Sequence, residues 1–332
     1  MLESAIAALA ALRSQDAGPL SQGLSAENAA ACLHQAIRPL NPTSLRAAVE
    51  AAGPIPPAIA IVVSSGVFTT PIEWTAIAVS AGCSVHLKAP ASDPALCRAL
   101  AEVFTANGAD VTWSISRKLP PVDAIIAFGG DQSVADVASA NPTVPVEQYG
   151  HRFSVAWVAG DPIAAAGPLA IDLVRYDGRG CMAPTAVFTT GDPHVLAEAI
   201  AGQFQELEQR FPRGAVDPGL GPEWRRRLGL ARVVGSSWTG SEWAVTVTPP
   251  KYFTPAALPR MVNIHPASSI DELRTILAPW RPWLSTLGTD ADGISIDGVH
   301  RVCRLGWMQA PSIPRHHDGR PMLYGLNRPP GG

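Results

Sequence analysis

Short apolar runs alternate with helical patterns along the first half of the chain. Residues 1–52 are rich in alanine at helical spacing, and Pro54, Pro56 and Pro57 end this segment. The apolar runs that follow are too short for helices and predict buried strands. These strands are residues 59–63, 84–87, 111–114, 124–128 and 154–158. The helices predicted between them are residues 71–81, a helix capped by Ser92 or Asp93 and running to about residue 107, and one from residue 132.

Loops of small residues follow two of these strands. Ser64, Ser65 and Gly66 come after the first strand, and Gly129-Gly130-Asp131 comes after the fourth. Strands that alternate with helices predict parallel βαβ units, in which ligands bind at the carboxyl ends of the strands. We therefore expect both loops to lie at a ligand site of an α/β fold.

The second half of the chain has a second α/β pattern. Residues 186–189, 243–247 and 261–265 are predicted strands, and residues 194–210 and 270–277 are predicted helices, the latter with Ser268 or Ser269 near its cap. The tail from residue 315 is rich in Pro, Gly, His and Arg, which is typical of a loop or an intersubunit arm rather than a domain.

Length and charge narrow the class of protein. The 332 residues suit two α/β lobes or one large unit, and 47% of them are hydrophobic against 16% charged. Such a low charged fraction suggests a buried subunit interface and hence a homo-oligomer. The net charge of −3 argues against nucleic acid or an anionic membrane as the main partner.

The cysteines indicate a reducing environment. The chain has five, an odd number, with no CxxC pair and no Cys/His spacing typical of a metal site. This pattern argues against a disulfide framework or a structural zinc and favours the cytoplasm. The N-terminus has an acidic Glu3 and no basic region, so it is interpreted as an amphipathic helix rather than a signal peptide. No apolar run reaches the roughly 20 residues of a membrane span.

One cysteine stands in a setting that suits a nucleophile. Cys181 follows Gly178 and Gly180 in a turn before a predicted strand. A reactive thiolate needs positive potential or backbone N–H donors, which a Gly-rich turn leading into a short helix, or Arg179, could supply. From the residues alone, a small buried apolar cysteine is the favoured interpretation, and the nucleophile is the alternative. Four others are predicted to be packing residues: Cys32, Cys83, Cys97 and Cys303.

Several segments, in order, resemble the aldehyde dehydrogenase superfamily. Gly180-Cys181 resembles its active-site cysteine segment, residues 81–90 resemble the strand whose lysine meets the adenosine ribose, and residues 148–154 fall where it places a glutamate. Within the superfamily the chain is most similar to the LuxC-type acyl-CoA reductases of bacterial bioluminescence. That resemblance rests on residues 127–131, 149–154, 176–181 and 298–306, with His317-Asp318-Gly319 after them, and covers about residues 55–325.

The resemblance implies an aldehyde-dehydrogenase-like α/β fold. Residues 1–160 would form mainly a Rossmann-type NAD(P)-binding domain with N-terminal helices, residues 161–310 an α/β catalytic domain, and residues 311–332 a C-terminal arm. It also implies that Cys181 attacks an acyl thioester, on CoA or an acyl carrier, and that NADPH or NADH reduces the S-acyl enzyme to an aldehyde. An acyl-transferring or aldehyde-consuming enzyme would be a natural partner. Cofactor contacts would come from Ser64, Ser65, Gly66, Lys88, Gly129, Gly130 and Asp131.

The expected site departs from the superfamily at two points. Gln148 falls where hydrolytic members have a glutamate base, and glutamine cannot take a proton from water, so reduction is favoured over hydrolysis. Glu147 is the neighbouring alternative, although it would point to the opposite face of a strand. The superfamily's oxyanion-binding asparagine is absent, which leaves Ser65, Thr69, Thr70 or the backbone N–H of Cys181 as donors.

Other interpretations stay open on the sequence. His151 is a candidate acid/base group beside Cys181 and Gln148, as is the His316-His317 pair. The same residues would suit a CoA-acylating aldehyde dehydrogenase working in the oxidative direction. The missing asparagine favours a third interpretation, a noncatalytic subunit that binds a nucleotide or a partner enzyme, which the retained Cys181 opposes.

Overall fold

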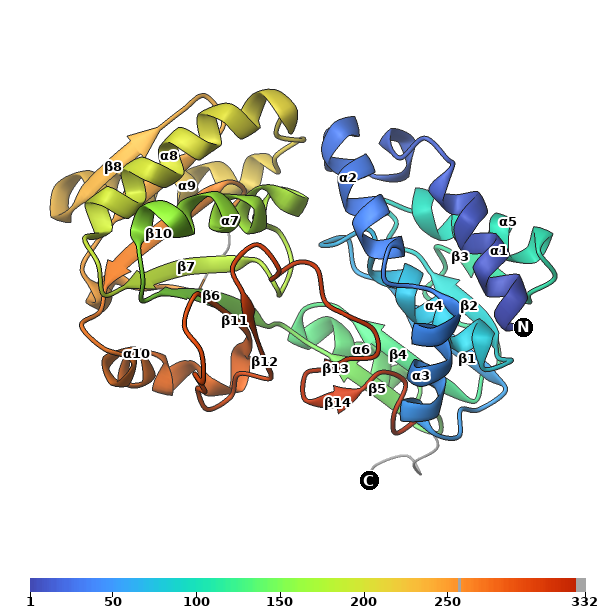
Figure 1. Cartoon of the computed structure of the whole chain (residues 1–332). Coiled ribbons are helices and arrows are strands. Elements are labelled where there is room, and N and C mark those ends of the chain that lie inside the picture. The colour runs from blue at the N-terminus through green and yellow to red at the C-terminus, as the bar shows by residue number, and fades with distance from the viewer. Residues whose placement is uncertain (256–257, 327–332) are drawn as a thin grey trace. The chain divides into compact units, whose positions relative to one another are not determined.

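The computed structural model describes residues 1–255 and 258–326 of the chain. The chain divides into two compact units. The first contains Met1–Gln22, Ala29–His151 and the C-terminal residues from Ser312, and the second contains Gly23–Asn28 and Arg152–Pro311. Figure 1 labels the helices and strands of both units along the chain.

The first unit is built on a five-stranded parallel sheet in the order β3-β2-β1-β4-β5. The chain moves outward from β1 to β3 and then returns to place β4 on the other side of β1. The carboxyl ends of β1 and β4 therefore flank a topological switch point, where open α/β sheets bind ligands. The strands are β1 (Ala58–Val62), β2 (Ser84–Lys88), β3 (Val111–Ser114), β4 (Ala124–Phe128) and β5 (Val146–Tyr149).

Helices cover this sheet, and their sequences explain how. The first helix buries Ala5, Ala8, Leu9 and Leu12, which share one face at helical spacing. The third begins at an Asn41 cap that receives two backbone N–H groups, and it ends before Gly53, whose φ is 72°. The helices are α1 (Leu2–Arg13), α2 (Ala26–Ile37), α3 (Pro42–Ala52), α4 (Thr70–Ser80), α5 (Ala95–Ala106) and α6 (Asp131–Ala140).

The second unit has a seven-stranded sheet in the order β12-β11-β6-β7-β10-β9-β8. All neighbours are parallel except β8 and β9. The strands are β6 (Phe153–Val158), β7 (Pro184–Thr189), β8 (Ser236–Thr239), β9 (Ala244–Val247), β10 (Met261–Pro266), β11 (Leu284–Thr289) and β12 (Arg301–Arg304). The helices are α7 (Pro162–Val174), α8 (Pro193–Arg210), α9 (Gly221–Val234) and α10 (Ile270–Leu277).

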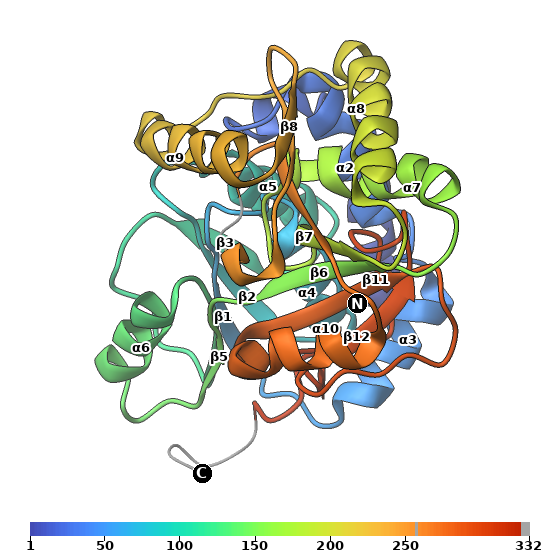
Figure 2. The same cartoon turned by 90° about the vertical axis from the view of Figure 1, so that its left-hand side faces the viewer.

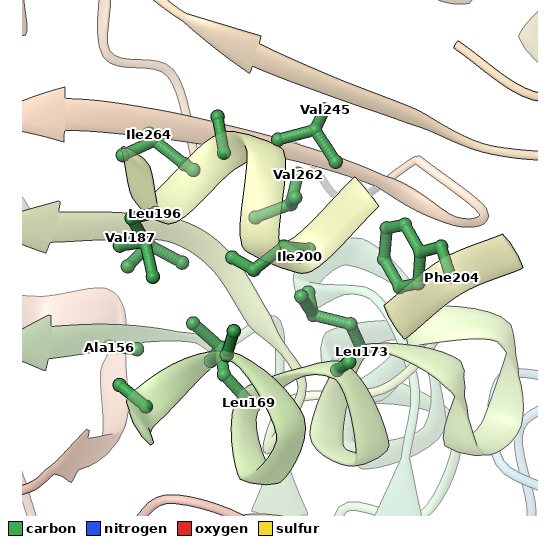
Figure 3. Packing of buried hydrophobic residues seen from close by; sticks show 14 of the residues in the cluster. Ala156, Leu169, Leu173, Val187, Leu196, Ile200, Phe204, Val245, Val262 and Ile264 are labelled. Carbon is green, nitrogen blue, oxygen red and sulfur yellow. The ribbon is translucent and has the colours of Figure 1, made fainter. Parts of the chain in front are cut away.

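Alternate residues of the central strands supply two cores. Ala156 and Val187 face α7 and α8, which pack side by side against the sheet (Figures 1 and 3). Phe153, Val155 and Phe188 belong to a second cluster on the other face, together with Leu273 of α10. Figure 2 shows α10 and the pair α7 and α8 on opposite sides of this sheet. Every strand residue of β6 and β7 is buried, as expected for strands covered on both faces.

The strands and helices predicted in the first half are confirmed to within one or two residues, apart from one cap. Neither Ser92 nor Asp93 caps α5, whose N-cap is Pro94. Asp93 instead accepts a hydrogen bond from the backbone N–H of Gln22 at 3.4 Å. In the second half, Ser269 caps α10 as predicted, by accepting from Glu272. Among the elements that the sequence patterns missed are β5, α7, α9, β8 and β11, whereas the residues around Cys303, which were predicted to be strand-like, form β12.

Along the chain the two compact units divide after His151 and after Pro311, where the sequence analysis placed domain boundaries after residues 160 and 310. The strand β6 lies in the second sheet, between β7 and β11, because its backbone pairs with both. The residues from Ser312 belong to the first unit, where β13 (His316–His317) and β14 (Arg320–Pro321) form a short hairpin. Across residues 1–255 and 258–326, no helix is both long and apolar enough to cross a bilayer.

Candidate active site

Cys181 follows a turn with an unusual backbone. The helix α7 ends at Val174, and a short 3₁₀ helix, Arg175–Gly178, carries the chain toward the cysteine. Tyr176 and Asp177 have φ values of 53° and 54°, a left-handed conformation that is costly for residues with side chains. The helical turn precedes Cys181, and the strand predicted after the cysteine is β7, which begins at Pro184. Gly178 and Gly180, with φ of 70° and 95°, also adopt the left-handed backbone conformation.

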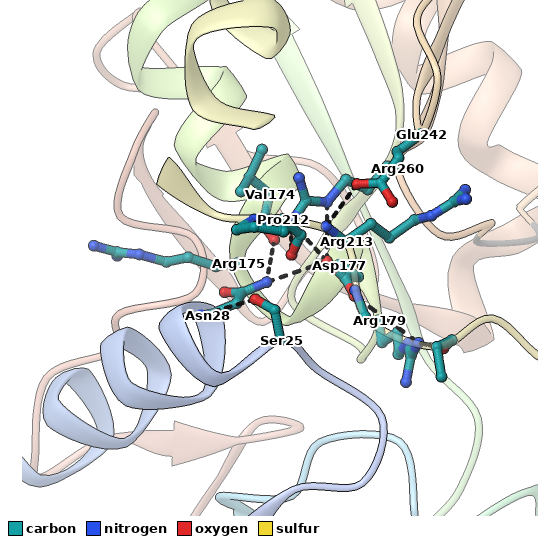
Figure 4. Close-up of polar contacts among 12 residues, drawn as sticks. Ser25, Asn28, Val174, Arg175, Asp177, Arg179, Pro212, Arg213, Glu242 and Arg260 are labelled. Carbon is teal, nitrogen blue, oxygen red and sulfur yellow. Dashed lines mark hydrogen bonds and ion pairs between the residues drawn. The ribbon is translucent and has the colours of Figure 1, made fainter. Parts of the chain in front are cut away.

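Buried polar contacts hold this turn in place (Figure 4). The Asp177 carboxylate accepts hydrogen bonds from Asn28 Nδ2 at 3.1 Å, from Arg260 Nε at 2.9 Å and from the backbone N–H of Gly214 at 3.0 Å. The Arg260 backbone N–H donates to the Asp177 carbonyl at 3.2 Å. The two charged side chains are 2% and 0% exposed. A buried ion pair is tolerated only when its remaining polar atoms are also satisfied, which this network achieves.

A serine holds the cysteine's own peptide. Ser154, on β6 and fully buried, donates from its hydroxyl to the Cys181 carbonyl at 2.5 Å. The same hydroxyl accepts from the backbone N–H of Thr286 on β11 at 3.0 Å. The Thr185 hydroxyl on β7 donates to the Ser154 carbonyl at 3.2 Å. Three strands therefore fix the main chain at Cys181.

The five cysteines differ in burial. Burial raises the pKa of Cys83 and Cys303 to about 11 and that of Cys97 to about 12. Thiolate is the nucleophilic form, so these three are poor nucleophiles at neutral pH. Cys32 is fully buried, which shields it from a substrate, whereas Cys181 is a partly exposed residue.

Arg179, a candidate source of positive potential for the Cys181 thiolate, contacts the backbone and a carboxylate of the second unit. Its Nη2 donates to the Ala215 carbonyl at 2.6 Å and lies 3.9 Å from the Asp177 carboxylate. These contacts tie the turn to the segment after α8. We therefore assign Arg179 to the support of the turn.

The first unit presents a cradle at its switch point. Ser64, Ser65 and Gly66 follow β1, and Gly129 and Gly130 follow β4, so both loops lie at the carboxyl ends of adjacent strands. A Cβ built on Gly66 or Gly130 would meet no atom within 4 Å, so the backbone here is open to a close-approaching ligand. Lys88 ends β2, beside Val62 of β1. Backbone N–H groups, hydroxyls and a lysine suit the phosphates and ribose of a dinucleotide, so the residues present fit such a cofactor.

Asp131 closes a loop in the same unit. Its carboxylate, at the start of α6, accepts from the backbone N–H of His151 at 2.7 Å. A Cβ on Gly150 would lie too close to the same carboxylate oxygen, so a larger residue there would displace the carboxylate from this hydrogen bond. The contact joins the segment after β4 to the segment after β5. The His151 side chain itself is exposed.

Gln148 and Glu147 point to opposite faces of β5, as their adjacency in a strand requires. Gln148 is exposed, whereas Tyr149 is buried and Glu147 is partly buried. Arg320 of β14 pairs with the Glu147 carboxylate at 2.6 Å and lies over the Tyr149 ring, 5.6 Å from its centroid. The carboxylate is therefore engaged by an arginine, and Gln148 is the polar side chain that β5 presents on its other face.

Two further candidates are engaged in packing or turns. The His317 ring packs against Tyr149 with a centroid distance of 4.7 Å and also contacts Trp74 and Phe128. The Thr70 hydroxyl donates to the Val67 carbonyl at 2.8 Å, which competes with any role as an oxyanion donor. Within residues 1–255 and 258–326, no group of three or more His, Cys, Asp or Glu side chains is placed to hold a metal.

The sequence patterns did not reveal what supports the cysteine. Ser154 lies in residues 149–154, one of the segments that carry the family resemblance, but its contact with Cys181 depends on the pairing of β6 with β7. Asn28 and Arg260 are distant from Asp177 in the chain, and no local pattern links them. The available signal was a Tyr-Asp-Gly turn beside the cysteine, which indicates an Asp with a structural task.

Comparisons with known proteins agree with this architecture. A family model described as acyl-CoA reductase (LuxC) matches residues 56–328. The long-chain acyl-protein thioester reductase of Aliivibrio fischeri is 26% identical over 275 residues, which are 72% of this chain and 56% of that protein. The chain thus spans about half the length of this curated relative.

Solved structures share the fold at low sequence identity. An oxidoreductase from Marinobacter aquaeolei matches with a TM-score of 0.77 and 13% identity, over 98% of this chain and 82% of that one. Aldehyde dehydrogenase 21 of Physcomitrella patens, in complex with succinate, matches with a TM-score of 0.75, also at 13% identity and with the same coverage. The P. syringae indole-3-acetaldehyde dehydrogenase AldA, in complex with NAD⁺, has a TM-score of 0.73 and 13% identity over 98% of this chain and 81% of its own. The fold is that of the aldehyde dehydrogenases, and with its family match over most of its length the chain belongs to the acyl-CoA reductase (LuxC) family.

Proposed function

We propose that this chain reduces an acyl thioester to an aldehyde with NAD(P)H, through an S-acyl intermediate on Cys181. The observation that carries the proposal is the setting of Cys181. The residue is partly exposed, and its backbone is held by Ser154 and by the Asp177 turn, in a chain of an acyl-CoA reductase family. A nucleophile that is already held in the attack geometry reacts faster, because less entropy is lost on reaching the transition state.

The chemistry divides into acyl transfer and reduction. The Cys181 thiolate attacks the thioester carbonyl, the bond from the acyl carbon to the carrier sulfur breaks, and the carrier leaves as a thiol after taking a proton. Bound NAD(P)H supplies a hydride to the acyl carbon. The carbon–sulfur bond to Cys181 then breaks, which releases the aldehyde and restores the thiolate. Sulfur suits both stages because it is a strong nucleophile and a good leaving group.

Residues of the first unit would hold the cofactor. The backbone at Gly66, Gly129 and Gly130 would approach the pyrophosphate, with the Ser64 and Ser65 hydroxyls as further donors. Lys88 would meet the adenosine ribose, and a lysine there permits the 2′-phosphate of NADPH. Asp131 would act indirectly, since its carboxylate closes the loop to His151.

Gln148 would determine the fate of the S-acyl enzyme. A glutamate would serve as a base for water and would favour the carboxylic acid, whereas glutamine has no such capacity. The S-acyl enzyme would then be reduced by hydride rather than hydrolysed by water. His151, with its exposed side chain, stays a candidate proton donor to the released carrier thiol.

The acyl donor would be a CoA or a carrier-bound thioester. The relative from Aliivibrio fischeri is a long-chain acyl-protein thioester reductase, which favours a protein-bound long acyl chain. The same residues would support the reverse direction, CoA-acylating aldehyde oxidation, if the cofactor were supplied oxidised. A reduced nucleophilic thiol suits a reducing compartment such as the cytoplasm. Assembly into a homo-oligomer or with an acyl-transferring enzyme stays a prediction.

An aldehyde assay tests the proposal. The protein is incubated with a long-chain acyl-CoA and either NADPH or NADH, and aldehyde is trapped as a hydrazone and quantified. We expect aldehyde equal in amount to the nicotinamide oxidised. Aldehyde formation at the same rate with Cys181→Ala would refute the assigned nucleophile, and no aldehyde with either cofactor would refute the reductase.

A further inference from the structure

A pocket within the second unit has no lining residue from the Cys181 turn. It occupies about 190 Å³ between α9, the loop after β9 and one face of β9 and β10. That face is opposite the one on which Val245, Val262 and Ile264 join α7 and α8 in the core. Its polar lining includes Arg226, Arg227, Thr246, Thr248, Lys251 and Asn263.

The lining carries an excess of positive charge. Arg226 and Arg227 share one carboxylate, Glu223, at 2.7 and 3.0 Å. Lys251 contributes a third cation, with its Nζ 5.2 Å from the centroid of the Tyr252 ring. The described residues that line the pocket include no acidic side chain. Three cations and one carboxylate favour an anionic occupant.

The guanidinium of Arg227 is incompletely satisfied. Its side chain is 10% exposed, and its Nε donates to Glu223. Its Nη2 is shielded from solvent and has no hydrogen-bond partner among the described residues. A buried charged donor without an acceptor is costly, so an additional oxygen ligand would be favourable here.

The floor of the pocket is polar and ordered. The Thr246 and Thr248 hydroxyls each lie 3.1 Å from Asn263 Oδ1, and Asn263 Nδ2 donates to Thr248 at 3.1 Å. Thr246 and Thr248 are buried, although threonine is usually exposed. A fixed set of hydroxyl and amide groups under three cations is suited to a tetrahedral oxyanion rather than to an apolar chain.

We infer that this pocket binds a phosphate group of the carrier that delivers the acyl thioester. The inference rests on the proposed function, and specifically on CoA or an acyl carrier protein as the acyl donor, because both hold the thiol on a phosphate-bearing pantetheine arm. Guanidinium groups are the preferred protein ligands of phosphate. The pocket would add affinity for the carrier without contacting the reacting carbonyl.

Binding of carrier fragments tests the inference without catalysis. Calorimetry measures the affinities of CoA, 4′-phosphopantetheine and phosphate-free pantetheine for the full chain carrying Cys181→Ala. The pocket variants are Lys251→Gln, Arg226→Gln and Arg227→Gln, and Arg225→Gln, an exposed arginine of the same helix outside the pocket, is the control. We expect the pocket variants to weaken binding of the phosphate-bearing ligands roughly 10- to 100-fold, with pantetheine and the control unchanged.

The outcomes separate the sources of phosphate. A loss with both CoA and 4′-phosphopantetheine assigns the pocket to the phosphate of the arm, and a loss with CoA alone assigns it to the nucleotide end. Lys251→Gln and Arg226→Gln change exposed side chains, so these two variants still test phosphate binding by the pocket if Arg227→Gln does not fold. Equal affinities of the phosphate-bearing ligands for the Cys181→Ala parent and for these two variants would overturn the inference. Because the binding needs no acyl transfer, a failure of the reductase assay would leave this result intact.

Discussion

The Ser154 hydroxyl donates a hydrogen bond to the main-chain carbonyl of Cys181 at 2.5 Å while it accepts one from the Thr286 backbone at 3.0 Å. A buried side chain on β6 thus holds the peptide of the proposed nucleophile. The Asp177 network fixes the same segment from its other end. Cys181 is partly exposed, but its backbone is anchored in the interior of the second unit.

Ser154→Ala should slow acylation of Cys181. Loss of the hydroxyl leaves the Thr286 N–H without its acceptor and frees the Cys181 carbonyl to shift, and misplacing a reacting group costs about 100-fold per ångström. We expect kcat to fall at least about tenfold while the KM for NAD(P)H stays constant. Stopped-flow acylation and steady-state kinetics measure the two effects.

Thr189→Ala is the matched control for Ser154→Ala. Thr189 is buried at the far end of β7, and its hydroxyl accepts a hydrogen bond from the Gly191 N–H group at 3.0 Å. Both variants should lose about 1–3 kcal/mol of stability through unsatisfied backbone donors. If Thr189→Ala slowed acylation as much as Ser154→Ala does, the positioning role of Ser154 would be rejected.

Asp177→Asn should destabilise the second unit by about 3–5 kcal/mol, because it leaves the buried Arg260 guanidinium without its counter-charge. Arg260→Gln should cost a similar amount by stranding the Asp177 carboxylate. The double variant should cost clearly less than the sum, since the two groups interact directly at 2.8 Å. Urea unfolding of the three variants measures the coupling. Strictly additive losses would show that the pair is not coupled.

His265 should make stability fall in acid. Burial lowers its pKa from 6.5 to about 4, with a smaller effect from the charge of Arg227. The unfolded chain then binds more protons than the native chain between these values, so stability is complete above about pH 6.5 and is lost as pH falls toward 4. The loss should reach about 2 kcal/mol at pH 4.5.

His265→Gln isolates this contribution. Asp172 titrates with the opposite sign, because burial raises its pKa to about 6, so the wild-type curve alone is ambiguous. The difference between wild-type and variant unfolding free energies, measured from pH 7 to pH 4.5, cancels the Asp172 contribution. A difference that does not change with pH would mean that His265 keeps an ordinary pKa.

Gly130→Ala should weaken cofactor binding at unchanged stability. Gly130 has an ordinary φ of −69°, and an added Cβ meets no protein atom within 4 Å, so the folded chain accommodates it. A bound pyrophosphate would collide with it, and we expect the Kd for NADPH to rise at least about tenfold.

Gly202→Ala, in α8, is the control for Gly130→Ala, because its added Cβ also meets nothing. Fluorescence titration of NADPH compares the two variants with the wild type. Equal affinities in all three would place the cofactor elsewhere.

The fold was predictable where short-range patterns decide the structure. The runs at residues 59–63 and 124–128 are apolar throughout because parallel strands are covered on both faces, and they became β1 and β4. The strand β5 was missed because Val146–Tyr149 is half polar and lies at a sheet edge. The helix α7 was missed because Gly167 and Pro168 interrupt it, although tertiary packing on α8 stabilises it.

The candidate site was predictable residue by residue but not as a network. Motif order identified Cys181, Gln148 and the glycine loops. The partnerships of Asp177 with Arg260 and of Ser154 with Thr286 join residues far apart in the chain. Such contacts depend on strand order, which a single sequence does not encode in any local pattern. The pocket beside Arg227 was not predicted either, because its lining residues come from α9, β9 and β10, which only the fold brings together.

The most direct test of the central claim is the intact mass of the protein after incubation with a long-chain acyl-CoA in the absence of nicotinamide. We predict a mass increase of one acyl group, located at Cys181 by peptide mapping and absent from Cys181→Ala, and its discharge as aldehyde when NAD(P)H is added. An acyl group on Cys32, Cys83, Cys97 or Cys303, or an adduct that NAD(P)H does not discharge as aldehyde, would contradict the account.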